Sequence, residues 1–195
     1  MKNKIKEYQI MQENSNNSFW NQQFGRWLIY RGFVNSNDEV IELGCGDKSL
    51  YNILRQKVKK MDAYDYPKVD CEKSLEFKSN SYDVIVLQMV VEHIVNYIQL
   101  FREYKRVLRE NGRLIIMTFD ASKKYKGFIG DPTHVTPFCI ERLKQLGIMF
   151  SMKTLFLRHF RAIPRTWKLT YKAFDIPFPT PDMLVIYIKD FKGFK

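Results

Sequence analysis

The chain has 195 residues and a formal net charge of +11 at pH 7, with 45% hydrophobic and 15% aromatic residues. This length suits one α/β domain with a substantial core, and the composition excludes a disordered chain. No apolar run approaches the roughly 20 residues that span a bilayer, and the basic N-terminus lacks the apolar core of a secretory signal. We therefore expect one domain over residues 1–195, in the cytoplasm.

The positive charge permits a nucleic acid, an anionic lipid surface or a phosphorylated substrate as a partner, but it does not choose among them. A solvated, lysine-rich surface explains the charge equally well. The three cysteines, Cys45, Cys71 and Cys139, are scattered and fit reduced thiols better than disulfides or a zinc site. No metal site is predicted, because the histidines are far apart in the sequence and lack partners at ligand spacing.

Residues 1–37 form a predicted helical cap before the first strand. Trp20, Phe24, Trp27 and Leu28 recur at helical spacing, which indicates an amphipathic helix. Such a helix can pack on the sheet or close over a bound ligand, and we favour packing.

The chain is organised around residues 39–49. A short buried strand, Val40–Leu43, runs into a turn with Gly44 and Gly46, and a helix with an apolar face follows. Glycines here allow positive φ and close approach of a ligand to the backbone. The pattern predicts a ligand-binding corner.

The residues Glu42-Leu43-Gly44-Cys45-Gly46 resemble the first motif of the class I methyltransferases that depend on S-adenosylmethionine. The dinucleotide-binding fingerprint would instead require a glycine where Ser49 stands. The methyltransferase motif usually has a third glycine where Lys48 stands, so the chain departs from it there. The resemblance implies that Glu42, Gly44, Cys45 and Gly46 bind the cofactor.

The segment Lys60–Asp65 is predicted as a second strand that ends on an acid. Asp65 lies near the spacing at which doubly wound folds place a carboxylate on a ribose. The resemblance implies that Asp65 binds the ribose and that Tyr66 lies beside the adenine. Asp62 is the competing ribose ligand, and we prefer Asp65 because the turn at Pro67 begins directly after it.

The passage from Val69 to Ile85 resembles the part of the family in which an acid follows the third strand and a Phe-Asp-Val-Ile strand comes next. The resemblance implies that Asp70 and Cys71 touch the adenine ring. The apolar run Tyr82–Gln88 is predicted as a strand buried on both faces.

The next segment, Gln88-Met89-Val90-Val91-Glu92-His93-Ile94, resembles the Leu-Glu-His segment of the small-molecule branch of the family, type 11. The resemblance implies that Gln88, Met89 and His93 lie at the cofactor site. The His93 imidazole either bonds to a backbone carbonyl or lies beside the methyl donor, and we favour the structural role.

Strands and helices alternate from Val40 to Phe119. A helix with Tyr97, Phe101, Tyr104 and Leu108 on one face is predicted to end at Asn111-Gly112, and a buried strand follows. Apolar stretches at residues 154–157 and 183–188 suit two closing strands. The prediction is a Rossmann-like, doubly wound α/β fold with a mostly parallel seven-stranded sheet, helices on both faces and the ligand at the strands' carboxyl ends.

Residues 120–182 are predicted to form the substrate side. The sequence Asp131-Pro132-Thr133-His134 resembles a loop found after the fifth strand in methyltransferases of small molecules and glycan precursors. The resemblance implies that it overhangs the methyl donor, where Asp131 or His134 is the catalytic base for a substrate hydroxyl. Alternatively, His134 only ties the loop to the helix that Thr136-Pro137 starts and Gly147 ends.

The basic and aromatic residues of segment 161–174 could grip a phosphate, a base or a lipid headgroup, or form an amphipathic cover. The resemblance implies methyl transfer from S-adenosylmethionine, with S-adenosylhomocysteine as product, to oxygen of a small molecule or glycan precursor. A nucleic-acid methyltransferase is the runner-up, favoured by the charge, although the Asp/Asn-Pro-Pro-Tyr motif is absent after Leu87. A non-catalytic binding subunit is a further alternative, as is peripheral membrane contact, and the oligomeric state is open.

Overall fold

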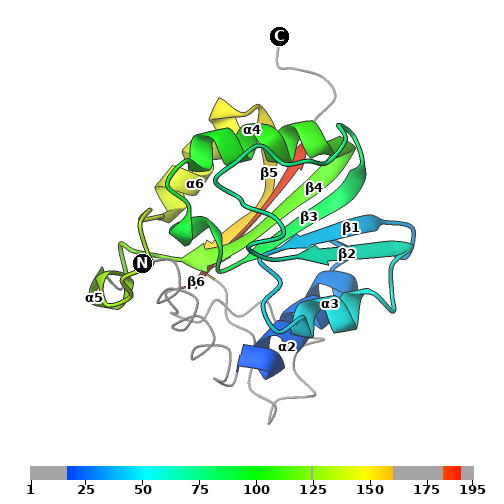
Figure 1. Cartoon of the computed structure of the whole chain (residues 1–195), viewed down its shortest axis with the longest axis horizontal. Helices are drawn as coiled ribbons and strands as arrows, with labels where there is room; N and C mark the ends of the chain where they lie inside the picture. The colour runs from blue at the N-terminus through cyan, green and yellow to red at the C-terminus, as the bar shows by residue number, and fades with distance from the viewer. Residues whose placement is uncertain (1–16, 124, 160–181, 190–195) are drawn as a thin grey trace.

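The computed structural model describes residues 17–123, 125–159 and 182–189, and the side chains from residue 21 onward in the first helix. Figure 1 shows a sheet with helices on both sides. The elements in chain order are α2 (Asn17–Tyr30), β1 (Glu39–Leu43), α3 (Ser49–Leu54), β2 (Lys60–Tyr64), β3 (Tyr82–Gln88), the 3-10 helix η1 (Val91–His93), α4 (Tyr97–Val107), β4 (Leu108–Phe119), α5 (Tyr125–Ile129), α6 (Ile140–Met149), β5 (Met152–His159) and β6 (Asp182–Lys189).

The strands of the described residues form one six-stranded sheet in the order β2-β1-β3-β4-β6-β5. The pairings β1·β2, β1·β3 and β3·β4 are parallel, whereas β6 runs antiparallel to both β4 and β5. The predicted α/β, mostly parallel architecture is confirmed. The seventh strand is not found in the described part of the chain.

The segment expected to contain the third strand, residues 65–81, consists of turns and irregular backbone. Its residues are mostly exposed and mostly polar or charged, and only Leu75 is buried, so it offers no continuous apolar face for pairing. Glu103 and Arg106 of α4 hold the segment instead, because Glu103 accepts the Leu75 N–H and Arg106 donates to the Leu75 carbonyl. The side of β2 away from β1 is therefore an edge of the sheet.

Two apolar cores lie on opposite faces of the sheet because successive strand residues point to opposite sides. Ile85 and Leu87 of β3 face α4 and α6, whereas Val84 and Val86 face α2 and α3. In Figure 1, α4 and α6 lie above the sheet and α2 and α3 below it. Helices therefore cover both faces, as predicted.

The end of α4 differs from the prediction. The helix stops at Val107, and residues from Leu108 onward already belong to β4, where Leu108 pairs with Tyr82. Asn111 does take a positive φ of 60°, but it does so inside the strand segment and not at a helix end. The Asn111-Gly112 pair does mark a left-handed backbone position, but the prediction that the helix ends there was wrong.

The bounds of α6 also differ from the prediction. The Thr136 hydroxyl donates to the Ile94 carbonyl at 2.6 Å and does not cap the helix, which starts at Ile140. Gly147 lies inside the helix, which ends at Met149. A Cβ at this position would come within 2.9 Å of the Tyr187 ring. This glycine permits close packing of α6 on β6 and does not end the helix.

The predicted N-terminal helix corresponds to α2, in which Phe24 and Leu28 are completely buried against the sheet. This burial agrees with the packing interpretation. The Trp20 side chain, residues 1–16 and the basic segment 161–174 lie outside the described residues. No described helix has the length and apolar character needed to cross a membrane.

Candidate functional site

The turn after β1 is shaped by its glycines. Gly44 has a φ of 77° and Gly46 a φ of 43°, and the Gly44 N–H donates to the Tyr64 carbonyl at 2.8 Å. A Cβ on Gly44 would lie 2.3 Å from Cγ2 of Val90, whereas one on Gly46 would meet no atom within 4 Å. The turn therefore packs tightly against the segment after β3 on one side and is open on the other.

Lys48 occupies the position where the family motif usually has its third glycine. Its φ of 60° and ψ of 21° lie in the left-handed region. A lysine reaches this region at a cost of roughly 1–2 kcal/mol, so the departure from the motif changes the residue type but preserves a glycine-like backbone.

Asp65 joins the end of β2 to the glycine turn. Its carboxylate accepts the N–H groups of Gly46 and Tyr66, each at 2.7 Å. Asp62, the competing ribose ligand, instead accepts the Tyr82 hydroxyl at 2.6 Å and pairs with Lys60. Only Asp65 of the two acids contacts the turn.

Glu42 lies within the β1 end of the turn with 3% of its surface exposed, and its Oε2 has no hydrogen-bond partner among the described residues. Burial raises its pKa to about 8, and the nearby Asp47 and Asp65 add to the rise. Three carboxyl groups thus converge on this corner in a chain whose net charge is +11. Glu42 is mostly protonated at neutral pH in the free protein, so the negative charge of the corner comes from Asp47 and Asp65, and a cation beside Glu42 would favour its ionised form. This charge suits a cationic ligand and opposes the pyrophosphate of a dinucleotide.

This buried carboxyl predicts a pH-dependent stability. Between pH 4.5 and 8 the unfolded Glu42 carboxyl loses its proton while the folded one retains it, so the free energy of unfolding falls as the pH rises. We expect Glu42→Gln to remove a loss on the order of 1–4 kcal/mol. Thermal melts from pH 5 to 8 test this: the wild-type Tm should fall more steeply than the variant's, and parallel profiles would contradict it.

The other predicted residues of this corner are placed around Asp65. Burial raises the pKa of the Cys45 thiol to about 11 and that of Cys71 to about 12, and the Asp65 charge contributes to both shifts. Both cysteines are therefore protonated and unsuited as nucleophiles. Tyr66 is 52% exposed, and Asp70 accepts the Glu72 N–H and pairs with Lys73.

Gln88 is the last residue of β3, and Met89 follows it. The Gln88 amide donates to Asn21 of α2, and its Oε1 is buried without a partner in the described part of the chain. Met89 takes a φ of 54°, and its N–H donates to the Met117 carbonyl. The contact with Asn21 links the N-terminal helix to this edge.

The two histidines of the predicted site lie together, with ring centroids 4.9 Å apart. His93 Nδ1 lies 3.1 Å from the Thr133 carbonyl, and His134 Nδ1 lies 3.1 Å from the Phe128 carbonyl. Burial lowers the pKa of His93, which favours its neutral form. His93 and His134 are far apart in the sequence but adjacent in the structure, because the loop after α5 folds back onto η1. The argument from sequence separation against a metal site is therefore wrong for these two histidines.

Asp131 lies beside His134, with its Oδ2 3.8 Å from His134 Nε2. Partial burial alone would raise the pKa of Asp131, but hydrogen bonds from Thr133 and the nearby histidines lower it below its ordinary value. Asp131 is therefore ionised at neutral pH.

Glu92 is the functional candidate that the sequence interpretation missed. It is fully buried, accepts the Thr118 hydroxyl at 2.8 Å through Oε2, and leaves Oε1 without a described partner. Burial raises its pKa to about 7. The sequence did offer one indication of this role, because Glu92 is a charged residue directly after the apolar residues Met89, Val90 and Val91.

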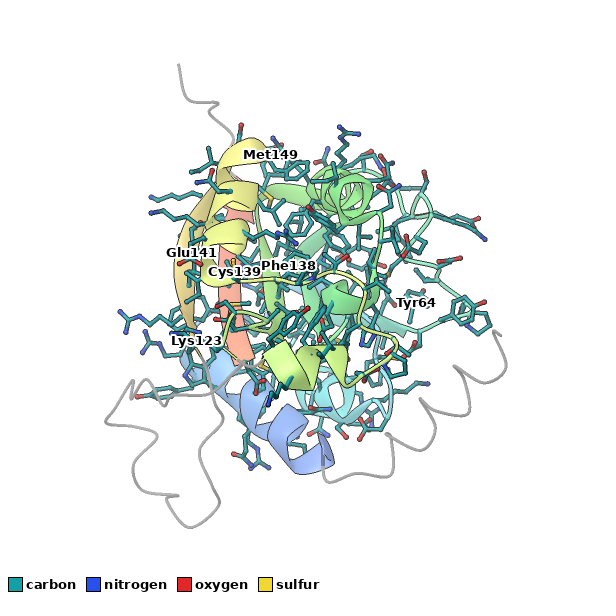
Figure 2. The ribbon with its side chains drawn as sticks, turned by 90° about the vertical axis from the view of Figure 1, so that its left-hand side faces the viewer. Tyr64, Lys123, Phe138, Cys139, Glu141 and Met149 are labelled. Atoms are coloured by element: carbon teal, nitrogen blue, oxygen red, sulfur yellow. The ribbon has the colours of Figure 1, made fainter. Side chains whose placement is uncertain are left out.

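The loop that carries His134 is fixed to η1 by its backbone. The N–H groups of Val135 and Thr136 both donate to the Glu92 carbonyl, at 2.9 and 3.0 Å. Phe138 anchors the far end of the loop, since it is buried and packs edge-on against Tyr97 of α4. Figure 2 shows Phe138 pointing into the interior, whereas Lys123, at the start of the same substrate-side segment, lies at the surface.

A pocket beside β2 contains Asp62, the competing ribose ligand, but none of the residues that the resemblance assigns to the cofactor. It is lined by Lys48, Tyr51, Met61, Asp62, Ala63, Tyr64 and Lys68. We do not assign the cofactor to it, because Gly44, Gly46 and Asp65 are not among its lining residues.

The sheet order and the glycine turn after β1, with Asp65 bonded to it from the end of β2, are those of a class I methyltransferase fold. A family model described as a methyltransferase domain matches residues 21–156, which is more than half of the chain. The chain therefore belongs to this family of methyltransferase domains, and the predicted methyltransferase class is confirmed at the level of the family.

Solved structures agree with the fold. A putative methyltransferase from Bacillus halodurans has a TM-score of 0.67 at 16% identity, over 85% of this chain and 98% of that one. A SAM-dependent methyltransferase from Archaeoglobus fulgidus has a TM-score of 0.65 at 16% identity, over 82% and 90%. An uncharacterized Methanocaldococcus jannaschii protein, MJ0638, is 26% identical over 111 residues, or 51% of this chain. That match spans about half of the relative's length, 49%.

Proposed function

We propose that the protein transfers a methyl group from S-adenosylmethionine to a hydroxyl of a small molecule or glycan precursor. The observation that carries the proposal is the acidic corner at Glu42, Gly44, Gly46 and Asp65. In it, Oε2 of the buried Glu42 carboxyl lacks a partner among the described groups, and the turn is open at Gly46. S-adenosylmethionine carries a sulfonium and an ammonium, so it complements this charge.

Each residue of the corner would bind a different part of the cofactor. The unpaired Oε2 of Glu42 fits a cationic donor group, and the Asp65 carboxylate can accept two hydrogen bonds from a ribose diol. Tyr66, Asp70 and Cys71 would then flank the adenine, and Gln88 and Met89 would close the side toward α2. Bound S-adenosylmethionine would supply a methyl group that a sulfonium already activates, so the protein mainly has to align the acceptor.

The substrate side rests on His134 and Asp131. The carbonyl of Phe128 can only accept a hydrogen bond, so Nδ1 of His134 carries a proton, and in the neutral ring Nε2 has a lone pair. That lone pair can take the proton of an acceptor hydroxyl, and the ionised Asp131 at 3.8 Å stabilises the resulting imidazolium. His93, held by the Thr133 carbonyl, keeps the same loop in place.

A screen for turnover tests this proposal. We expect release of S-adenosylhomocysteine with at least one acceptor in a panel of nucleotide sugars, glycans and hydroxylated small molecules. His134→Gln should lower kcat about 10²- to 10⁴-fold, whereas the affinity for S-adenosylhomocysteine should stay within about 3-fold. An RNA arm belongs in the panel, because the net charge of +11 favours that alternative acceptor.

Two outcomes would overturn the proposal. Turnover on RNA alone would replace the acceptor class with nucleic acid. Cofactor binding without turnover on any acceptor would favour a non-catalytic subunit, although the left-handed Lys48 keeps the glycine-like turn that such a subunit would not need.

A further inference from the structure

Glu92, His93 and His134 together offer three metal-ligand atoms that lie within 4.8 Å of one another. Two of these residues lie in η1 directly after β3, and the third lies on the loop that donates to the Glu92 carbonyl. The cluster is therefore built from two chain segments that backbone hydrogen bonds hold in register. Its location is the carboxyl edge of the parallel strands, where Val90 touches Gly44 of the glycine turn.

The hydrogen bonds of both imidazoles leave the same atom free for a metal. Each Nδ1 faces a backbone carbonyl, which only accepts, so each Nδ1 carries a proton, and in the neutral ring each Nε2 carries a lone pair. Histidines that bind metals commonly donate their second ring N–H to a backbone carbonyl in this way. The two rings are thus held in the tautomer that a metal ligand requires.

Glu92 supplies an independent observation. Its side chain is completely buried, the Thr118 hydroxyl fixes Oε2, and Oε1 has no partner within the described ranges. An isolated carboxylate in such a place is unfavourable, and buried charges are normally paired or bound to a metal. A cation between Glu92 and the histidines would satisfy this oxygen.

We propose that Glu92, His93 and His134 bind a divalent transition-metal ion, and that this ion holds an acceptor through two adjacent oxygens. Two imidazoles and one carboxylate are a ligand set typical of Zn²⁺, Mn²⁺ or Fe²⁺ sites that keep open positions for substrate. Bond lengths near 2.0–2.2 Å require ligand atoms about 3–3.5 Å apart, so atoms separated by up to 4.8 Å have to approach by about 1.3–1.8 Å at most. The acceptor class is then a vicinal diol or a hydroxy acid.

The chemical step is balanced without an oxidant or reductant, and this part of the proposal rests on the proposed function. The acceptor hydroxyl bound to the metal becomes more acidic, and its proton passes to the Asp131 carboxylate and then to water. The oxygen lone pair forms the new O–CH₃ bond, while the C–S bond breaks and its electrons neutralise the sulfonium. When the metal is bound, Nε2 of His134 is a ligand and cannot act as the base, so Asp131 takes over the base role that the proposed function gives to His134 in the metal-free site.

The test is a Co²⁺ titration of the full-length protein, prepared without a polyhistidine tag and freed of metals by a chelator. Visible absorption bands report nitrogen and oxygen ligands on Co²⁺. We expect one ion per chain, and at least about 10-fold weaker binding in Glu92→Gln and in His134→Gln. His159→Gln is the matched control, because His159 lies outside the cluster and bonds to the Asp120 carboxylate. A glutamine at this position can still donate a hydrogen bond to that carboxylate. It should bind Co²⁺ like the wild type.

The outcomes separate the metal site from the proposed function. Absence of Co²⁺ bands in the wild type, or equal binding by wild type and His134→Gln, would overturn the metal site. Should Glu92→Gln fail to fold, His134→Gln decides. Binding of S-adenosylhomocysteine, measured on the same preparations, distinguishes the two failures. A protein that binds Co²⁺ but not S-adenosylhomocysteine would contradict only methyl transfer. A protein that binds S-adenosylhomocysteine but not Co²⁺ would contradict only the metal site. On a diol acceptor, a chelator should lower turnover at least about 10-fold and Mn²⁺ should restore it.

Discussion

Replacement of Gly44 by alanine should destabilise the protein and abolish cofactor binding. The new Cβ would lie 2.3 Å from Val90 Cγ2, on a backbone whose φ of 77° already disfavours alanine. Overpacking of 1–3 kcal/mol and left-handed strain of 1–2 kcal/mol sum to roughly 2–5 kcal/mol. Urea denaturation measures the loss, and calorimetry with S-adenosylhomocysteine measures the affinity, which should fall more than about 100-fold, roughly 2.7 kcal/mol or more.

Two further variants identify the cause. Gly46→Ala meets no atom within 4 Å, so its stability should fall by only about 1–2 kcal/mol, from backbone strain. Val90→Ala, combined with Gly44→Ala, removes the clashing methyl groups and should recover part of the stability that Gly44→Ala loses. No recovery in the double variant would show that the contact with Val90 is not what constrains the turn.

Asp65→Ala should weaken S-adenosylhomocysteine binding by about 10- to 100-fold. The substitution removes both the proposed ribose acceptor and the hydrogen bond that holds the Gly46 N–H. Charge-assisted hydrogen bonds of this kind are worth about 1.5–3 kcal/mol each. Calorimetric titration measures the change directly.

Asp62→Ala is the matched control for this prediction. It removes an acid three residues earlier whose carboxylate bonds to Tyr82 and Lys60 instead of the Gly46 N–H. Its affinity should remain within about 3-fold of the wild type. A larger loss from Asp62→Ala than from Asp65→Ala would reverse the assignment of the ribose ligand.

The central strand β3 was predictable because a strand buried on both faces appears as a nearly continuous apolar run. The predicted β3, Tyr82–Gln88, matches the structure residue for residue, and the predicted β1 and β2 are correct within one residue at each end. The glycine corner was predictable because positive φ and close packing both require glycine. The same reasoning misled at Gly147, where the glycine makes room for Tyr187 inside a helix.

Contacts between distant segments could not be predicted from the sequence. Nothing local indicates that the His134 loop returns to Glu92, because the hydrogen bonds that bring it there come from backbone N–H groups of Val135 and Thr136. Thr136 has the features of a helix cap, but a tertiary contact with Ile94 takes its hydroxyl. The absence of a strand in residues 65–81 depends likewise on Glu103 and Arg106, which hold Leu75 from α4.

The central claim is that the acidic glycine corner binds S-adenosylmethionine. Calorimetric titration of the purified wild-type protein with S-adenosylmethionine and S-adenosylhomocysteine tests it most directly, since neither ligand requires a known acceptor. We predict one site per chain with a dissociation constant on the order of micromolar, about −8 kcal/mol. Failure of the folded wild-type protein to bind either ligand would contradict the account and direct attention to the basic surface as a partner-binding face.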